Sequence, residues 1–203
     1  MTKTEIFIYD NIQQIVVDAY LVEGIPLDVI AKANLEWTRI RQEYRSRCKQ
    51  QGLPYPEHSH WDWEDKVKHS EMFSMIQTRF GIVCRDEVQG LMLVEQMTEF
   101  SKLPPNKGEP LLYVKYLEVA PQNVEPYANP RKFRGVGGVF LRVAVDYSMA
   151  VGCEGRVGLH ALPQAEAFYL TNGMTKLDRD PSHSGLRYFE FTNEQAQEYQ
   201  KRK

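Results

Sequence analysis

The stretch Lys132-Phe133-Arg134-Gly135-Val136-Gly137-Gly138-Val139-Phe140-Leu141 places three glycines within four positions, directly before a run of apolar residues. Glycine destabilises a helix interior, so glycines clustered at a helix entrance indicate an unusual turn or a close approach of the backbone to another group. The first turn of a helix also presents free N–H groups and a positive dipole end, which favour an anion. The stretch therefore predicts an anion site at the start of a helix, close packing against a neighbouring strand, or no more than a loop.

Three well-known phosphate loops can be compared with this stretch. A dinucleotide loop needs Gly-x-Gly-x-x-Gly, but the sixth position counted from Gly135 is Phe140, which is too large for the close packing required there. A Walker loop ends in Gly-Lys-Ser or Gly-Lys-Thr, and no such triplet follows. A kinase glycine loop lies between antiparallel strands, whereas this stretch opens a helix. The pattern that remains is Lys132-x-x-Gly135-x-Gly137.

Apolar periodicity on both sides of the glycines predicts the order of the elements. Residues 6–17 cluster apolar side chains without a clean period, so their type stays open. The nearly continuous apolar run 111–120 predicts a central strand that is covered on both faces. The expected helices are 26–51, 61–70, 137–151 and 163–171, and the expected strands are 80–84, 90–96, 111–120, 156–161, 174–177 and 186–191. This order predicts a mixed α/β domain.

Length and composition narrow the class of protein. A chain of 203 residues favours one domain, 1–203, and 42% hydrophobic with 26% charged residues is ordinary for a globular protein. A net charge of -2 argues against strong sequence-independent binding of nucleic acid. No window approaches the length of a membrane span, and the N-terminus lacks the apolar core of a signal peptide. The three cysteines, Cys48, Cys84 and Cys153, are odd in number and widely spaced. This favours a reducing cytoplasm over disulfides or a zinc site.

The glycine pattern resembles the acyl-CoA loop of the GNAT N-acetyltransferase superfamily, which is usually written Gln/Arg-x-x-Gly-x-Gly/Ala. Two further stretches resemble family landmarks in the expected order: Leu117-Glu118-Val119-Ala120-Pro121, which ends the strand before the loop, and Ala167-Phe168-Tyr169-Leu170-Thr171-Asn172-Gly173-Met174 after it. The resemblance covers residues 72–192, and the helix over 26–51 matches the family's first helical segment. Lys132 departs from the family's Gln or Arg, and the connection 122–134 is longer than usual.

The resemblance implies a fold and a cofactor. The fold is a mostly antiparallel central sheet of about six to seven strands flanked by helices, with a splay between the two central strands. The cofactor is acetyl-CoA, with its pyrophosphate on the backbone of the glycine loop, its pantetheine arm along the central strand, and no metal. The coenzyme-binding residues implied are Leu117, Glu118, Val119, Lys132, Phe133, Arg134, Gly135, Val136, Gly137, Gly138 and Tyr169.

Acetyl transfer to an amine requires two proton steps. The departing coenzyme A thiolate must be stabilised or protonated, and the amine must lose a proton. The resemblance assigns Tyr169 to the first, a hydrogen bond to the departing thiolate, although an aromatic residue before a Gly stop can also be purely structural. Glu118 is the candidate base for the second, but strand alternation places it on the opposite face from Leu117 and Val119, and a structural role is open for it as well. His160, on the following strand, is a second candidate base, and a structural role is open for it too.

The segment Glu57-His58-Ser59-His60-Trp61-Asp62-Trp63-Glu64-Asp65 is the other unusual cluster. His58-x-His60 followed by Asp62 lacks the helical spacing of a zinc protease, so the sequence argues against a metal. The family's acceptor side matches this segment, and Trp61, Asp62 and Trp63 are expected either to receive a cationic amine or to anchor the loop on the core.

The resemblance thus implies an N-acetyltransferase, and the cysteines indicate a cytoplasmic one. Its partner would be a primary amine of a small molecule or a protein, with no nucleic acid or membrane, and a homodimer is compatible with it. A catalytically silent GNAT-like module that binds coenzyme A or mediates an interaction is the alternative, because fold does not dictate activity.

Overall fold

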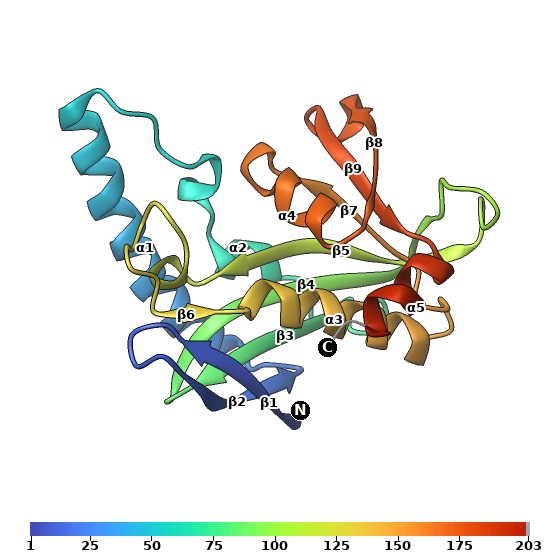
Figure 1. Ribbon diagram of the computed structural model, residues 1–203, viewed down its shortest axis with the longest axis horizontal. Helices are drawn as coiled ribbons and strands as arrows, with labels where there is room; N and C mark the ends of the chain where they lie inside the picture. Colours follow the sequence, from blue (N-terminus) through green and yellow to red (C-terminus); the bar gives the residue numbers. More distant parts are fainter. Residues whose placement is uncertain (202–203) are drawn as a thin grey trace. The chain divides into compact units, whose positions relative to one another are not determined.

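The computed structural model describes residues 1–201, with the side chain of Glu57 excepted, and it contains a nine-stranded sheet with flanking helices (Figure 1). The strand order is β6-β1-β2-β3-β4-β5-β7-β9-β8. The strands are β1 (Thr2–Asp10), β2 (Ile15–Glu23), β3 (Gln77–Cys84), β4 (Glu87–Phe100), β5 (Pro110–Val119), β6 (Phe133–Arg134), β7 (Val157–Ala161), β8 (Thr175–Asp180) and β9 (Leu186–Phe191). The helices are α1 (Leu27–Gln51), α2 (Trp63–Val67), α3 (Val136–Ala150), α4 (Glu166–Thr171) and α5 (Asn193–Lys201), with short 3-10 helices η1 (Glu57–His60), η2 (Pro121–Asn123), η3 (Pro163–Ala165) and η4 (Pro181–His183).

The sheet is mixed and mostly antiparallel, as the resemblance implies. β5 pairs with β7 in parallel, whereas β1 with β2 and β6, β2 with β3, and β9 with β7 and β8 are antiparallel. The sheet has more strands than expected because a hairpin, β1 and β2, and the two-residue β6 extend it at one edge.

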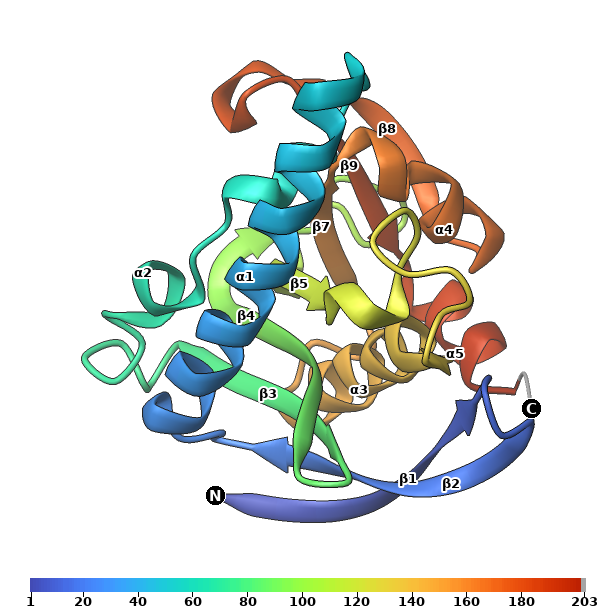
Figure 2. The same ribbon diagram turned by 90° about the vertical axis from the view of Figure 1, so that its left-hand side faces the viewer.

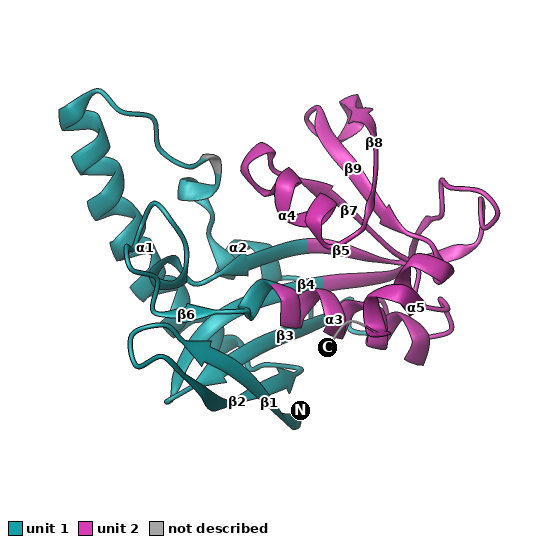
Figure 3. Ribbon diagram, viewed as in Figure 1, with its two compact units in different colours: residues 1–74, 78–93, 116–137 teal, residues 75–77, 94–115, 138–203 magenta. Residues whose placement is uncertain are grey.

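The chain divides into two compact units, and each is built from separated stretches of sequence (Figure 3). Unit 1 consists of Met1–Ser74, Thr78–Leu93 and Tyr116–Gly137. Unit 2 consists of Met75–Gln77, Val94–Lys115 and Gly138–Lys203. β4 and β5 contribute residues to both, and the single domain 1–203 stays a prediction.

In unit 1, α1 spans nearly the predicted range. Pro26 precedes it, and Gly52 ends it in the left-handed conformation at φ 66°. Its apolar side packs in a core with β4 and α2, and α1 lies across β3 and β4 in Figure 2. The buried residues of α1 are Ile30, Ala33, Asn34, Trp37, Arg41 and Cys48. Ile40 and Tyr44, which the apolar pattern includes, are only half-buried.

Two other parts of unit 1 differ from the sequence expectation. The ambiguous residues 6–17 belong to the long hairpin of β1 and β2, which pair from Thr2 with Glu23 to Asp10 with Ile15. The helix expected over 61–70 is confined to α2, because the N–H and hydroxyl of Ser70 both donate to the carbonyl of Val67 and close a turn there.

In unit 2, β5 and β7 pair over only three residues, from Leu112 with Val157 to Val114 with Leu159. β5 continues to Val119, and the part of the chain that the structure describes gives residues 115–119 no partner on β7. The splay that the resemblance implies stays a prediction. The C-terminal α5 was not expected from the sequence, since only Ala196 and Tyr199 of its polar sequence are buried.

Two simple expectations can be compared with the structure. Cys48, Cys84 and Cys153 are free and buried. Among residues 1–201, no helix combines the length and the apolar character needed to cross a membrane.

Candidate functional site

The glycine stretch forms an open turn at the start of α3. Gly135 lies between β6 and α3 with φ 90°, a value that L side chains rarely adopt, and a Cβ atom built there meets nothing within 4 Å. A Cβ atom built on Gly138, in the first turn, also meets nothing within 4 Å. The first turn of α3 contains no acidic residue that would repel an anion. The predicted anion site is therefore sterically open.

The residues just before this turn already make hydrogen bonds and an ion pair within unit 1. The N–H of Phe133 donates to Oδ1 of Asn123 at 2.9 Å, and β6 pairs with Tyr9 and Asp10 of β1. Lys132 Nζ lies 2.6 Å from Glu87 Oε2. The N–H of Phe133, which the sequence assigns to a phosphate cradle, is thus taken by the fold, and the groups left for an anion begin after β6.

The long connection 122–134 is a closed loop in unit 1. The buried Asn123 side chain donates to Gln89 Oε1 at 3.0 Å, and the N–H of Lys132 donates to the carbonyl of Gln122 at 2.9 Å. Between these anchors, the ring of Tyr127 packs edge-on against Tyr44, with centroids 5.2 Å apart. The loop therefore lies against α1.

The end of β5 alternates as the sequence predicts. Glu118 is 4% exposed, whereas its neighbours Leu117 and Val119 are half-buried. Arg41 Nη1 donates to Glu118 Oε1 at 2.8 Å, and the indole N–H of Trp63 donates to Oε2 at 2.6 Å. Burial raises the pKa of Glu118, while Arg41 and the Trp63 hydrogen bond act against this rise. Both carboxylate oxygens are held by buried donors, which favours the structural interpretation of Glu118.

His58 completes a group that we call the Glu118 cluster: Arg41, His58, Trp63 and Glu118. His58 Nε2 lies 3.9 Å from Glu118 Oε1. Burial, together with the positive charge of Arg41, lowers the pKa of His58 to about 4. His58 is therefore neutral at pH 7, and its approach to Glu118 is not an ion pair at that pH.

The predicted acceptor residues take different roles. Asp62 Oδ1 accepts the N–H of Asp65 at 3.1 Å and caps α2, while Trp63 is 1% exposed in the core. Trp61 is half-buried, and its ring packs edge-on against Tyr116 of β5 with centroids 5.8 Å apart. Lys66 Nζ lies 3.9 Å from the Trp61 centroid and 3.7 Å from the Tyr116 centroid. Of the three expected acceptor residues only Trp61 lies on this aromatic wall, which it forms with Tyr116, and Lys66 of the same chain occupies it. A role of these residues toward an acceptor amine stays a prediction.

Tyr169 belongs to α4 in unit 2. Its ring packs against Phe168 and Phe189, with centroids 5.2 Å and 5.6 Å away, and the residue is 7% exposed. Its hydroxyl makes no hydrogen bond with any residue that the structure describes. Burial raises the pKa of this hydroxyl, so it stays a protonated donor at neutral pH.

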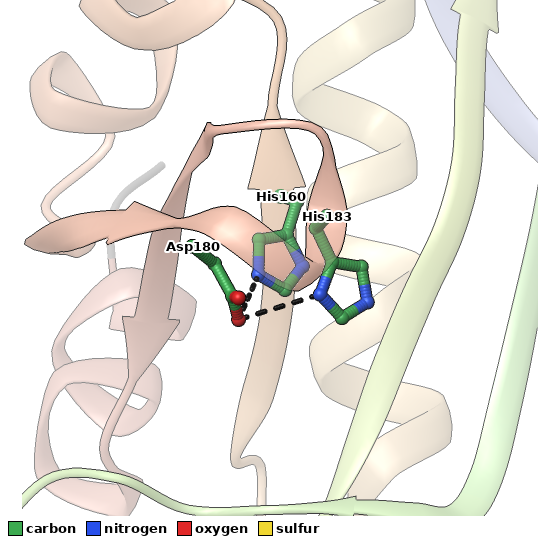
Figure 4. Close-up of side chains that lie close together, drawn as sticks. All are labelled: His160, Asp180 and His183. Carbon is green, nitrogen blue, oxygen red and sulfur yellow. Dashed lines mark hydrogen bonds and ion pairs between the residues drawn. The ribbon is translucent and has the colours of Figure 1, made fainter.

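His160, the other candidate base, belongs to a polar cluster in unit 2 (Figure 4). Its Nε2 lies 3.2 Å from Asp180 Oδ2, and its Nδ1 lies 2.7 Å from the Tyr113 hydroxyl. His183 Nδ1 approaches the same Asp180 oxygen at 3.3 Å. Burial lowers the pKa of His160 to about 4. Each ring nitrogen of His160 therefore has a partner and the ring is neutral, which favours a structural role.

Ligand atoms of His160, Asp180 and His183 lie within 4.8 Å of one another, close enough for one metal ion. However, the two imidazole rings are stacked, with centroids 3.8 Å apart and an interplanar angle of 9°. A metal ion lies close to the plane of each imidazole that binds it, so one ring would have to turn before both could bind. The carboxylate also lies 3.5 Å from Lys102 Nζ, which already supplies a positive charge.

Sequence reasoning missed four residues of unit 1: Arg41, Lys66, Tyr116 and Asn123. A signal existed for Arg41, because it follows Trp37 by four residues and so continues the buried side of the helix. Lys66, Tyr116 and Asn123 acquire their roles from long-range contacts, for which a single sequence has no pattern.

No protein-family model matches the sequence, and no curated protein matches it. Among solved structures, the chain is similar to a bacterial toxin with a TM-score of 0.51 and 16% identity, over 68% of this chain and 78% of that one. It is also similar to a tyrosine-to-phenylalanine mutant of the toxin AtaT bound to the C-terminus of the antitoxin AtaR and acetyl-CoA, with a TM-score of 0.47, 15% identity and coverage of 67% and 79%. A predicted acetyltransferase with acetyl-CoA from Clostridium acetobutylicum has a TM-score of 0.47 and 11% identity, over 80% of this chain and 93% of that one.

At 16% identity the likeness to the bacterial toxin concerns the fold alone. The mixed, mostly antiparallel sheet with its flanking helices agrees with the GNAT-like fold that the sequence resemblance implies.

Proposed function

We propose that this protein transfers an acetyl group from acetyl-CoA to a primary amine. The observation that carries the proposal is the open glycine turn, where neither Gly135 nor Gly138 places a side chain in the space that a phosphate oxygen would enter. The N–H groups of Gly135, Val136, Gly137 and Gly138 bind the pyrophosphate in this proposal, aided by the helix dipole and without a metal. Arg134 adds positive charge nearby in the sequence, whereas the charge of Lys132 is paired with Glu87.

The pantetheine arm is proposed to follow the end of β5. Leu117 and Val119 are half-buried there, and their backbone has no partner on β7 among the described residues, so main-chain groups are available for the amides of the arm. A main-chain N–H at this strand end would polarise the acetyl carbonyl, an interaction worth roughly 3–4 kcal/mol when one such donor is removed.

Two residues are proposed to serve the chemistry. Tyr169 donates its hydroxyl hydrogen bond to the thiolate of coenzyme A as the thioester breaks, since its raised pKa keeps it protonated. An acceptor amine with a pKa near 10.4 must lose a proton, which takes roughly 4–5 kcal/mol at pH 7. Glu118 is proposed to attract the ammonium of the acceptor rather than to act as a free base, because Arg41 and Trp63 hold its oxygens.

Thermal melting with acetyl-CoA and with NAD tests the proposal. Ligand at about 100 times its dissociation constant adds roughly 2.7 kcal/mol, so we expect acetyl-CoA to raise Tm by roughly 5–10 °C in a chain of this size. NAD serves as the control with a pyrophosphate but no pantetheine arm. A shift with NAD and none with acetyl-CoA would reject the proposal.

The variant Gly138→Ala is expected to raise the stability of the free protein and to weaken its binding of acetyl-CoA. Because Gly138 lies in α3 and a Cβ there meets no atom, alanine is expected to stabilise the free protein by about 0.5–1 kcal/mol. The added methyl group narrows the anion site, so the acetyl-CoA shift should become smaller. Gly52→Ala, at the end of α1, is the matched control and should leave that shift unchanged. An unchanged shift in Gly138→Ala would remove this residue from the site.

The catalytically silent module is the second candidate, and the pairing of Glu118 favours it because that carboxylate is not a free base. The two candidates differ in one measurement, the release of free thiol from acetyl-CoA when a panel of small amines and lysine peptides is supplied. Thiol release that depends on the amine supports the enzyme, whereas an acetyl-CoA melting shift without thiol release supports the module.

A further inference from the structure

Lys66 is held in an unusual place in unit 1. It belongs to the short α2, whose Trp63 and Val67 are buried in the core and fix the helix. Its Nζ lies 3.9 Å from the centroid of Trp61 and 3.7 Å from that of Tyr116. The amine is therefore held between two rings that come from different segments of the chain.

The amine of Lys66 also lacks the usual polar partners. It makes no hydrogen bond or ion pair with any described residue, whereas Lys68, two residues later, pairs with Asp65 at 3.2 Å. Burial lowers the pKa of Lys66 from 10.5 to about 8. At neutral pH a larger fraction of this amine is therefore neutral than in an ordinary lysine.

Charged groups from three segments surround this amine. Glu118 of β5, Asp62 at the N-cap of α2 and Asp65 within α2 raise the pKa of Lys66, while Arg41 of α1 lowers it. The pairing of Glu118 with Arg41 limits the net attraction of that carboxylate for Lys66. The lysine thus keeps the features of a nucleophile, a partly neutral amine in a fixed position.

The amine of Lys66 is connected to the proposed pantetheine site through Tyr116 of β5. Tyr116, whose ring contacts Lys66, directly precedes Leu117, the first residue of the strand end that is proposed to hold the pantetheine arm. An acetyl thioester bound along Leu117 to Val119 would lie beside the residue that Lys66 contacts. This step rests on the proposed function.

We propose that Lys66 is a modification site and accepts an acetyl group from acetyl-CoA bound to its own chain. Lys66 Nζ forms a bond to the thioester carbonyl carbon, the carbon–sulfur bond breaks, and coenzyme A leaves as a thiol that takes up the proton lost by the amine. The product is an uncharged acetyl-lysine between Trp61 and Tyr116. It removes the cation from the aromatic wall and so changes the amines that this wall can receive.

The test incubates the full chain with acetyl-CoA and follows the intact mass, with peptide mapping to locate the acetyl group. We expect Lys66 to be acetylated at least about tenfold faster than Lys68, in line with its larger neutral fraction. Lys66→Arg should abolish the fast phase, and Lys68→Arg, the matched control on the same segment, should keep it. The rate per molecule should not depend on protein concentration, and a rate that rises with concentration would overturn transfer within one chain.

Failure of this inference can be told apart from failure of the proposed function. If acetyl-CoA raises Tm and small amines release thiol while Lys66 stays unmodified, the inference is wrong and the proposed function stands. If acetyl-CoA gives neither a melting shift nor thiol release and Lys66 stays unmodified, both fall. Acetylation of Lys66 and Lys68 at equal rates would indicate unguided chemistry and would also overturn the inference.

Discussion

Arg41→Met is expected to lower the free energy of unfolding by about 3–5 kcal/mol, the range for breaking a buried ion pair from one side. Arg41 and Glu118 have side chains that are 1% and 3% exposed, with Nη1 and Oε1 2.8 Å apart. Methionine fills a similar volume but leaves the carboxylate buried without its cation. For a chain of this size the loss corresponds to a fall in Tm of roughly 6–20 °C, measurable by calorimetry.

Two further variants test whether charge, rather than packing, causes this loss. Arg39→Met changes an exposed arginine of the same helix and should shift stability by less than about 0.5 kcal/mol. Adding Glu118→Gln to Arg41→Met removes the unpaired charge and keeps an acceptor for the Trp63 indole, so the double variant should be more stable than Arg41→Met alone. A double variant that is less stable would mean that the lost contacts of Arg41, and not its charge, dominate.

Tyr169→Phe is expected to lower turnover by about 100-fold or more while leaving the fold intact, which is the scale of a lost general acid. The hydroxyl makes no hydrogen bond within the described residues, and phenylalanine keeps the ring contacts with Phe168 and Phe189. The free energy of unfolding should therefore stay the same or rise slightly. Turnover is followed as thiol release from acetyl-CoA with the best acceptor of the amine panel.

The control for this variant is Tyr20→Phe, a tyrosine of β2 that belongs to no candidate site. It should leave turnover and the acetyl-CoA melting shift unchanged. Tyr169→Phe should also keep the melting shift, because the hydroxyl is proposed to act on the thiolate and not on the pyrophosphate. Equal turnover in Tyr169→Phe and the unmodified protein would exclude the hydroxyl from the mechanism.

The parts of the fold that the sequence predicted are those in which local pattern and tertiary packing agree. Pro26 and Gly52 bound α1, and the apolar run ending at Val119 forms β5, because capping chemistry and continuous hydrophobicity are properties of neighbouring residues. The glycine turn was predicted for the same reason, since a left-handed φ at Gly135 follows from the absence of a Cβ.

The site was predicted less well, because its charges meet through contacts between distant residues. Glu118 is 77 residues from Arg41 and 55 from Trp63 along the chain, so its buried pairing could not be read from spacing. Phe133 is different, because Asn123, which accepts its N–H, is only 10 residues away, but side-chain to backbone bonds of this kind follow no sequence spacing. In both cases the sequence identified the correct strand or turn but not the partner that occupies the functional group.

The anchoring of the long connection has a consequence for how this protein can vary. Asn123 holds Gln89 and Phe133, and Gln122 holds Lys132, so the start of the glycine turn is fixed by hydrogen bonds at both ends of the loop. Residues 124–131 can therefore be lengthened, shortened or exchanged with little displacement of Gly135. Related chains could diversify this surface, where Tyr127 meets Tyr44 and His58, while the turn that precedes α3 keeps its geometry.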